Sequence, residues 1–546
     1  MKTGKHLFTR NICFVLAFVG LFVETAPAQI TLRVADYLTM PITGTVDGPG
    51  NAGSLARVNV MREEPGNAKR FFVSDLNGPL YILDSETKML STYLNFNGRG
   101  TQPGLFDKLT IDAGFANGLI TFQFDPDYTR NGKFYTVHLE DPAYPGSLLP
   151  DKTSVPGLNV SGYMPTTAIT TPGAIQRQGV LIEWTDTDNA NFTFEGTARE
   201  LLRVQLNTRI HPMGDLIFNP TARRGDPDWR VLYVSCGDGG SGEQLNNSMR
   251  LNPQLLDNLV GKISRIIPDL QEHTESSTIS SNGRYRIPND NPFASPLFAG
   301  ARKEIWAYGL RNPHRMTWDA EPGDPADNHL IAAVVGLHMW ETVDIIRKGA
   351  NYGYPLREGN QLLKPDNSTG PLPQPDRIPV QTSNLVFGAT VVPDYPVIQY
   401  PHVKDGGDAV AGGFVYRGKL LPALQGKFVF GDITTGRIWY SDYREMLKAN
   451  DGKPETMAPM HEVSVIWDRP LDDGRKVYTS MSPIVETAYH ARGGKDPDLP
   501  GNSTVSGASR VDMRFAIDSS GELYILSKSD GMIRAIVGAT ASSARN

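Results

Sequence analysis

Cysteine is nearly absent from the sequence, and its scarcity excludes several kinds of site. The 546 residues include 2 cysteines, Cys13 and Cys236. Cys13 lies in an N-terminal segment with the pattern of a signal peptide, so a cleaved chain would keep Cys236 alone and form no intrachain disulfide. The chain also lacks the C-x-x-C-H sequence of covalent haem attachment and the cysteines of a cysteine-rich zinc site. We therefore expect a large hydrophobic core to provide the stability.

Long apolar runs are missing beyond the N-terminus. Lys2, Lys5 and Arg10 precede the apolar segment 11–23, and the small-residue sequence Ala26-Pro27-Ala28 follows it. A basic start, a short apolar run and a small-x-small site predict a signal peptide over residues 1–28, cleaved after Ala28. The alternative is an uncleaved membrane anchor. We expect a secreted or periplasmic protein with no stable membrane span after cleavage.

An excess of charge of one sign is missing as well. Lysine and arginine total 53 against 59 aspartate and glutamate, which gives a net charge of −6. This balance argues against nucleic acid as a partner. The glycine-rich stretch GDGGSG (237–242) has no following Lys-Ser/Thr pair, so it is not a phosphate-binding loop. It is interpreted as a turn.

Turn residues are plentiful, with 54 glycines and 40 prolines, and a strand–turn–strand pattern recurs along the chain. Short runs rich in Val, Ile, Tyr and Phe are joined by turns that contain Asp, Asn or Gly, which is typical of β-hairpins. The six copies occupy residues 70–84, 122–140, 216–240, 316–336, 412–442 and 513–537. Six such units predict an all-β fold, a six-bladed β-propeller over residues 55–537. A pair of β-sandwiches is the alternative.

Other segments fall outside the repeats. Residues 29–54 are expected to lead into the propeller, and residues 538–546 to form a disordered tail. Residues 141–178 and 359–385 are rich in Pro, Gly, Ser and Thr and show little periodicity. Both are predicted to be long loop insertions over one face of the propeller, where binding residues often gather.

Several longer stretches carry a family resemblance, and they occur in the family's order. They are ANGLITFQFDPDYTRNGKFYTVH (116–138), LVGKISRI (259–266), AYGLRNPHRMTWD (307–319), WETVDIIRKGANYGYPLREG (340–359) and GGFVYRG (412–418). Together these stretches resemble the glucose/sorbosone dehydrogenase family, to which soluble quinoprotein glucose and aldose sugar dehydrogenases belong. The resemblance covers about residues 55–537.

The resemblance implies a six-bladed propeller that holds pyrroloquinoline quinone (PQQ) and Ca²⁺ near its axis. It implies oxidation of a sugar or another alcohol by hydride transfer to PQQ. Because the chain has no haem motif, the electrons would pass to an external acceptor. Two other functions stay open: a propeller that has lost catalysis and binds a ligand or carbohydrate, and a calcium-dependent lactonase, for which no carboxylate cluster can be assembled from the sequence.

The resemblance also assigns the central residues of a site. His211 falls where the family has its general base, and an imidazole suits proton abstraction near neutral pH. The family's His-x-Gly-Gly is His-Pro-Met-Gly here. Arg311 and Asn312 match the cofactor pair: a guanidinium fork can bind carboxylates, and an amide can donate to a quinone oxygen. The alternatives are a surface-loop histidine, a structural Arg–Asp pair and a turn asparagine.

Three further side chains are candidate PQQ contacts. Arg417 stands where the family has a lysine, and an exposed hairpin arginine is its alternative role. Asn117 stands where related enzymes often have a glutamine, and a turn residue is its alternative role. Arg514 comes from the last repeat, where the spacing of the family's arginine pair is altered.

Calcium is expected at the backbone carbonyls of Gly336 and Leu337. This position follows from the family's turn before its W-E-E sequence, which reads WET at 340–342 here. Many relatives have Asp-Val-Gly where this chain has Val334-Val335-Gly336, so a nearby carboxylate is missing.

Overall fold

A computed structural model gives the architecture. It describes Met1 and residues 29–44, 50–112, 117–245, 247–320, 328–403, 406–469, 476–501 and 507–542. The predicted signal peptide, apart from Met1, lies outside the described residues. Within the described part, no helix is long and apolar enough to cross a membrane.

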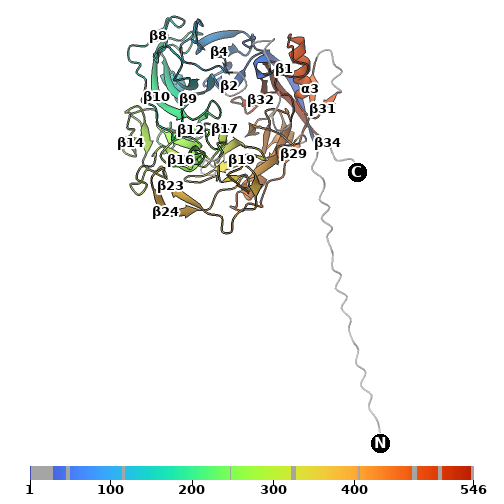
Figure 1. Cartoon of the computed structure of the whole chain (residues 1–546). Coiled ribbons are helices and arrows are strands. Elements are labelled where there is room, and N and C mark those ends of the chain that lie inside the picture. Colours follow the sequence, from blue (N-terminus) through green and yellow to red (C-terminus); the bar gives the residue numbers. More distant parts are fainter. Residues whose placement is uncertain are drawn as a thin grey trace.

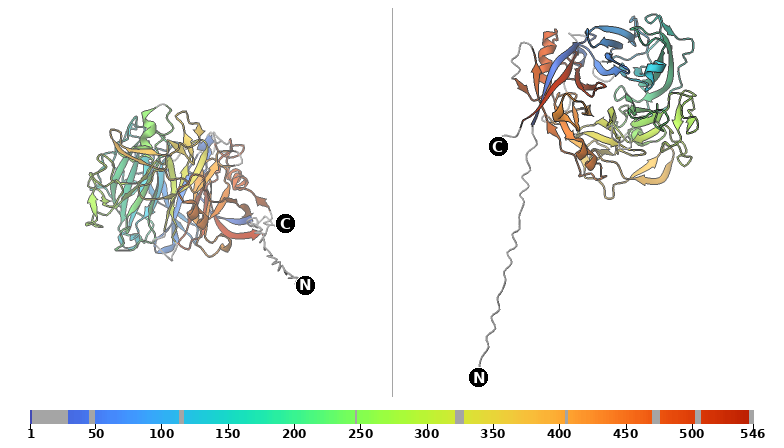
Figure 2. Two further views of the ribbon diagram at one scale, coloured as in Figure 1. Left: turned by 90° about the horizontal axis from the view of Figure 1, so that it is seen from below. Right: turned by 180° about the vertical axis from the view of Figure 1, so that it is seen from behind.

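Six β-sheets stand in a ring around a central axis, so the chain is an all-β, six-bladed propeller (Figure 1). Seen from below, the ring is a thick disc (Figure 2, left). Each of the six sequence repeats contributes strands to a different sheet, which confirms the predicted fold and excludes two β-sandwiches.

The first five sheets follow one another along the chain, with the innermost strand first in each of the following lists. Blade 1 contains β2 (Val58–Glu64), β3 (Asn67–Asp75), β4 (Pro79–Asp84) and β5 (Leu90–Asn95). Blade 2 contains β6 (Leu119–Phe124), β7 (Lys133–Glu140), β9 (Arg177–Asp186), β10 (Gly196–Leu206) and β8 (Leu158–Asn159). Blade 3 contains β11 (Met213–Phe218), β12 (Leu232–Cys236), β13 (Lys262–Ile266) and β16 (Ile305–Tyr308). Blade 4 contains β17 (Asn312–Trp318), β18 (Leu330–Val335), β19 (Trp340–Ile346) and β25 (Ile398–Pro401). Blade 5 contains β26 (Val410–Val415), β27 (Lys427–Asp432), β28 (Ile438–Asp442) and β29 (His461–Glu462).

The sixth sheet joins the two ends of the chain. Its strands, from the axis outwards, are β32 (Met513–Ile517), β33 (Leu523–Ser527), β34 (Met532–Ser542), β1 (Gln29–Thr39), β30 (Ser464–Asp468) and β31 (Val477–Tyr478). Strand β1 runs antiparallel to β34 and parallel to β30.

Two expectations about the chain ends are corrected by this sheet. Residues 29–39 are a strand of blade 6 rather than a lead-in, and residues 538–542 belong to β34 rather than to a tail. The hydrogen-bond partners of β1 lie at the opposite end of the chain, so no local pattern pairs them. Residues 543–546 lie outside the described part.

Shorter helices and strands lie outside the six blades. The helices are α1 (Tyr128–Asn131), α2 (Tyr443–Ala449) and α3 (Ser482–Ala491), and short 3₁₀ turns occupy Gly50–Gly53, Ser248–Gln254 and Pro422–Leu424. The small outer strands are β14 (Ser277–Ile279), β15 (Arg286–Pro288), β20 (Arg357–Glu358), β21 (Gln361–Leu363), β22 (Thr369–Gly370), β23 (Ile378–Gln381) and β24 (Val386–Val391).

Apolar side chains between neighbouring blades form the core, as expected for a chain without disulfides. Strand β12, for example, is buried along its whole length. Close packing at the axis requires glycine at one position: Gly412 has φ +86°, and a Cβ there would lie 2.7 Å from the Cβ of Arg315. Strand β26 can therefore pass beside β17 only with glycine at this point.

All six inner strands begin at one end of the ring, which we call the site face. Both insertions contact loops that lead to this face. In the first, the Ser147 amide donates to Asp107 at 2.9 Å. In the second, Arg250 donates to the side chain of Asn367 at 2.6 Å. These contacts agree with the expectation that the insertions cover one face.

Candidate functional site

The candidate site lies where the inner strands begin. His211 stands two residues before β11, Arg311 one before β17, and Asn117 two before β6. Because the inner strands surround one axis, their first residues converge at its end. A cavity of about 60 Å³ lies among the inner strands β2, β11, β17, β26 and β32.

His211 is oriented by a buried carboxylate. Its Nδ1 lies 2.7 Å from Oδ1 of Asp238, which is itself fully buried. Asp238 also accepts hydrogen bonds from the backbone N–H groups of Gly240 and Gly242, at 2.9 and 2.8 Å. Burial raises the pKa of Asp238, but the neighbouring His211 and Arg311 lower it overall. This carboxylate therefore holds a proton on Nδ1 and leaves Nε2 as the reactive nitrogen of His211.

The backbone at His211 is strained in a way that supports a special role. Its φ is +52°, an uncommon value for a residue with a side chain. The conformation is fixed from both sides, because Gly239 N–H donates to the His211 carbonyl at 3.0 Å and Gly237 N–H donates to Pro212 at 2.8 Å. Strain of this kind persists only where the surroundings enforce it, and it gathers at functional sites.

Arg311 reaches the same point from the next blade. Its guanidinium donates to Oε1 of Glu243 through Nη2 and to the Val335 carbonyl through Nη1 at 3.1 Å. The same Glu243 oxygen lies 3.8 Å from Nε2 of His211. Burial lowers the pKa of Arg311, but Glu243 and, to a smaller extent, Tyr354, Asp238 and Glu341 raise it, so that the pKa lies above its usual value. His211 and Arg311 therefore meet at one carboxylate.

Positive charge accumulates along the axis below this pair. Arg514 and Lys528 are buried, and burial, reinforced by neighbouring cations, lowers the pKa of Arg514 to about 9 and that of Lys528 well below its usual value. Burial and the cations Arg315 and Arg514 likewise keep His314 neutral by lowering its pKa. Within the described residues, Nε of Arg311, Nε of Arg514 and Nε2 of His314 are buried without a hydrogen-bond partner. Unpartnered buried donors next to clustered cations fit an anionic ligand.

The two candidate asparagines differ in their surroundings. Asn312 is the half-buried first residue of β17. Asn117 is fully buried, and its amide accepts from Thr110 at 3.0 Å and donates to the Arg209 carbonyl at 3.4 Å. Asn117 thus fastens the loop that carries His211, which is closer to the turn role than to a ligand contact.

Arg417 is not part of this group, contrary to its expected role as a cofactor contact. It follows the end of β26, whereas the other candidates precede or begin their inner strands. There it forms an ion pair with Asp319, which follows the end of β17, at 2.9 Å. The resemblance predicts a cation at position 417. Because Arg417 follows the end of β26, it lies at the end of the axis opposite to the site face.

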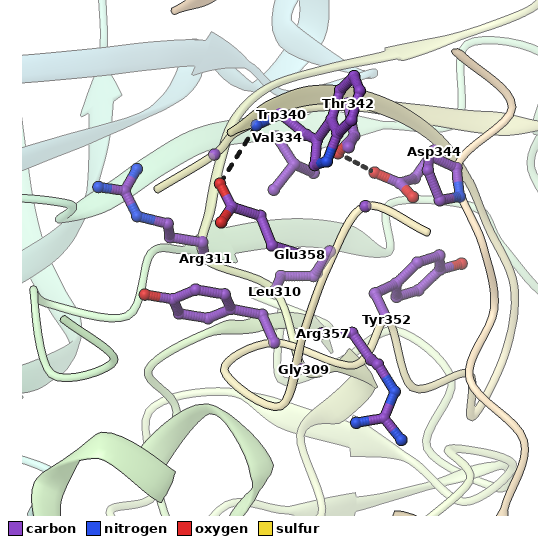
Figure 3. A pocket seen from close by; sticks show the side chains of 14 residues that line it. Gly309, Leu310, Arg311, Val334, Trp340, Thr342, Asp344, Tyr352, Arg357 and Glu358 are labelled. Atoms are coloured by element: carbon purple, nitrogen blue, oxygen red, sulfur yellow. Dashed lines mark hydrogen bonds between the residues drawn. The ribbon is translucent and has the colours of Figure 1, made fainter. Parts of the chain in front are cut away.

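The turn proposed for calcium is organised by two buried glutamates. Glu341 accepts from the Gly336 N–H at 3.0 Å. Oε1 of Glu358 accepts from four consecutive N–H groups, those of residues 337–340, at 2.8–3.3 Å. Figure 3 shows the bond from Trp340. Its other oxygen, Oε2, is buried with no partner among the described residues. A small cavity of about 30 Å³ separates this turn from Arg311.

A calcium ion at this turn remains a prediction. Among the described residues, no group of three or more His, Cys, Asp and Glu side chains could hold a metal ion. The donors available here are oxygens, the backbone carbonyls of Gly336 and Leu337 and the unpartnered carboxylate oxygen of Glu358. Oxygen donors suit a hard cation such as Ca²⁺.

Asp238 and Glu243 are the site residues that the sequence did not single out. Asp238 belongs to the glycine-rich stretch 237–242, which was interpreted only as a turn, and Glu243 directly follows this stretch. The signal was present in its composition: the small residues let the loop fold tightly, and a Cβ on Gly242 would lie 2.2 Å from the ring of Tyr354. In such a compact loop the carboxylates of Asp238 and Glu243, one near each end, can both lie close to His211.

Comparison with known proteins adds relatives of several kinds. The HIPL1 protein of Arabidopsis thaliana is 27% identical over 398 residues, 69% of this chain and 51% of that protein. The aldose sugar dehydrogenase YliI of Escherichia coli is 31% identical over 227 residues, 42% of this chain and 46% of that protein. The chain thus spans about half the length of the curated relatives it matches. The PQQ-bound aldose sugar dehydrogenase of Streptomyces coelicolor has 14% identity and a TM-score of 0.48, covering 94% of this chain and 100% of that chain.

The family model described as glucose / sorbosone dehydrogenase matches residues 65–461, well over half of the chain. The matched range begins within blade 1 and ends at β29 of blade 5, so it includes His211, Asp238, Glu243 and Arg311. The chain therefore belongs to the glucose/sorbosone dehydrogenase family.

Proposed function

We propose that the protein is an exported quinoprotein oxidoreductase that oxidises a sugar or another alcohol and passes the electrons to a separate acceptor. The observation that carries this proposal is the pair formed by His211 and Asp238. Asp238 binds Nδ1 of His211, and Nε2 of His211 faces Glu243, the carboxylate that pairs with Arg311. Membership of a sugar dehydrogenase family supports the same chemistry.

His211 would act as the base. A substrate hydroxyl placed at Nε2 can give up its proton to this nitrogen, and Asp238 stabilises the imidazolium that forms. Asp238 also prevents the ring from turning, because its carboxylate binds Nδ1 at 2.7 Å. Bound PQQ would supply the two-electron acceptor for the hydride of the same carbon.

Cofactor binding would use the cations of the site face. Arg311 and Arg514 would bind the carboxylates of PQQ, and Asn312 would donate to a quinone oxygen. The unpartnered Nε atoms of both arginines support this assignment. The carbonyls of Gly336 and Leu337 would hold Ca²⁺, which would add positive charge beside the quinone. Asn117 and Arg417 have no place in this arrangement, since both bind other parts of the protein.

Reconstitution tests the proposal. The purified protein is incubated with PQQ and Ca²⁺, its absorbance spectrum is recorded, and dye reduction is measured over a panel of aldoses and simple alcohols. We expect turnover with at least one sugar, and a loss of 10²–10⁴-fold in His211→Gln with PQQ binding retained. A protein that shows neither a PQQ spectrum nor turnover at saturating cofactor is not a quinoprotein dehydrogenase.

The second candidate is a propeller that binds a carbohydrate or another ligand without oxidising it. The observation in its favour is that Glu243 already occupies the guanidinium of Arg311. Calorimetric titration with sugars separates the two functions. Sugar binding without PQQ, unchanged in His211→Gln, supports the binding module and contradicts the dehydrogenase.

A further inference from the structure

We propose that Glu243 is a built-in competitor at the anion site of Arg311, and that it restricts this site to ligands with several acidic groups. The identification of PQQ as such a ligand rests on the proposed function, but the selectivity itself follows from the side chains. Glu243 would thereby be a specificity-determining residue of the site.

The contact geometry places Glu243 where a ligand carboxylate would bind. Its Oε1 accepts from Nη2 of Arg311, and it lies 3.8 Å from Nε2 of His211. Arg311 is 9% exposed, whereas Glu243 is 25% exposed, so the carboxylate covers the cation on its solvent side. Nη1 is held by the Val335 carbonyl, which fixes the direction of the guanidinium. A ligand carboxylate that binds Arg311 through both Nε and Nη2 must therefore displace Glu243.

The loop that carries Glu243 keeps the carboxylate close to Arg311. The Asp238 N–H donates to the Arg311 carbonyl at 2.7 Å, and the Gln244 side chain donates to Gly240 at 3.0 Å. Tyr354 packs against Gly242 so closely that no side chain fits there. A carboxylate tethered in this way competes at an effective concentration in the millimolar range or above.

This competition affects small and large anions differently. A monocarboxylate would form the same ion pair with Arg311 that Glu243 already forms. Replacing Glu243 therefore gives a monocarboxylate no net binding energy. A ligand with several acidic groups can bind Arg311 and also the buried cation Arg514, whose charged neighbours are the cations Arg315 and Arg510 and the carboxylate of Asp512. The binding energy of these additional contacts offsets the free energy needed to displace Glu243 from Arg311. The site is thus selective against simple acids, including aldonates that would form from oxidised aldoses.

Isothermal titration of the full-length protein tests the proposal, with acetate, citrate and PQQ as probes at one fixed ionic strength in calcium-free buffer. The variants are Glu243→Gln and the matched control Glu272→Gln. Glu272 is 24% exposed and pairs with Arg230 at 3.2 Å, so its loss removes the same charge from a similar ion pair elsewhere. Circular dichroism confirms that each variant is folded.

We expect wild type and Glu272→Gln to bind citrate and PQQ but not millimolar acetate. Glu243→Gln should bind acetate measurably, and its affinity for citrate and PQQ should rise at least tenfold. Equal affinities in wild type and Glu243→Gln would overturn the inference while leaving the quinoprotein proposal intact. Binding of acetate and citrate by Glu243→Gln alone, with no PQQ binding in any variant after Ca²⁺ is added, would keep the inference and refute the proposed cofactor. No binding by any variant, with Ca²⁺ again added for the PQQ titrations, would refute both.

Discussion

Asp238 links the two halves of the candidate site at the scale of single residues. It accepts from His211 and from two backbone N–H groups of its own loop, while its backbone N–H binds Arg311. It is fully buried, so removal of its charge leaves donors without an acceptor in a region closed to water. Its protonation state therefore affects stability as well as the proposed catalysis.

Replacement of Asp238 by Asn should destabilise the protein by about 1–3 kcal/mol at pH 7. The folded-state pKa of Asp238 lies below the unfolded value, so its contribution is complete above about pH 3.9 and disappears as the pH falls through the folded pKa. The difference in unfolding free energy between wild type and Asp238→Asn should shrink accordingly in urea titrations at pH 7, 5 and 3. Asp498→Asn, at an exposed position, is the control, and a difference that is constant with pH would contradict the prediction.

Strand β1 is the element whose role differs most from the expectation drawn from sequence. Its residues alternate between buried and exposed, with Ile30, Leu32 and Val34 turned into the core of blade 6. The period-two pattern was therefore visible in the sequence. Its partners were not, because the paired residues of β34 are about 500 positions away.

Leu32→Ala in β1 should cost about 2–5 kcal/mol of unfolding free energy, because Leu32 is fully buried between β34 and β30. The adjacent residue provides a control: Arg33 is 52% exposed and pairs with Asp468 on the surface. Arg33→Ala should change stability by less than about 1 kcal/mol. Urea unfolding measures both variants, and similar losses in the two would mean that β1 is not packed into the sheet as described.

The turn before β19 should open when its glutamate is removed. Glu358→Ala leaves four backbone donors of residues 337–340 without their acceptor, so we expect the exchange of these amides to accelerate at least tenfold. Glu358→Gln keeps one acceptor oxygen and should show a smaller effect. Hydrogen exchange followed by mass spectrometry on peptides covering 336–342 measures the change. Exchange rates equal to wild type in Glu358→Ala would show that the glutamate does not hold the turn.

Sequence reasoning reached the strands and one part of the site, for identifiable reasons. Alternating Val, Ile, Tyr and Phe between turn residues is a local signal, and each of the six repeats formed a sheet. Arg311 and His211 could also be predicted as site residues, because the sequence around them resembles the family. The role of Glu243 could not be predicted, because it arises only when its loop in blade 3 meets Arg311 at the start of blade 4. The position of Arg417 could not be foreseen either, because its residue type is visible in the sequence but the end of the strand that carries it, where it pairs with Asp319, is not.

At the scale of the whole molecule, Arg311, Arg514 and Lys528 place buried cations near the centre of the ring. Arg514 lies on inner strand β32, and beside Arg315 it carries a charge that burial disfavours. Buried like charges cost stability unless a counter-charge is supplied. The ring is therefore expected to gain stability from an anionic ligand at its axis.

Citrate should raise the melting temperature of wild type by a few degrees, whereas sodium chloride at equal ionic strength should not, because a ligand that binds only the folded state stabilises it. Arg514→Met removes a buried charge that has the cations Arg315 and Arg510 as well as the carboxylate of Asp512 around it. It should therefore leave the ligand-free protein at least as stable as wild type and reduce the citrate effect. Differential scanning calorimetry measures both. A large drop in the melting temperature of ligand-free Arg514→Met would contradict the picture of a strained cationic axis.

The pairing of β1 with β34 also sets an order of events during biosynthesis. Residues 29–39 leave the ribosome well before their partners, which lie at 464–468 in β30 and at 532–542 in β34. Joining segments about 500 residues apart costs on the order of 5 kcal/mol in loop-closure entropy, so this step depends on blades that have already formed. Strand β1 is therefore an unpaired, half-apolar segment until those partner strands have been made. Such a strand is a natural target for a chaperone that binds extended segments, and the chain can become a closed ring only when that segment is released.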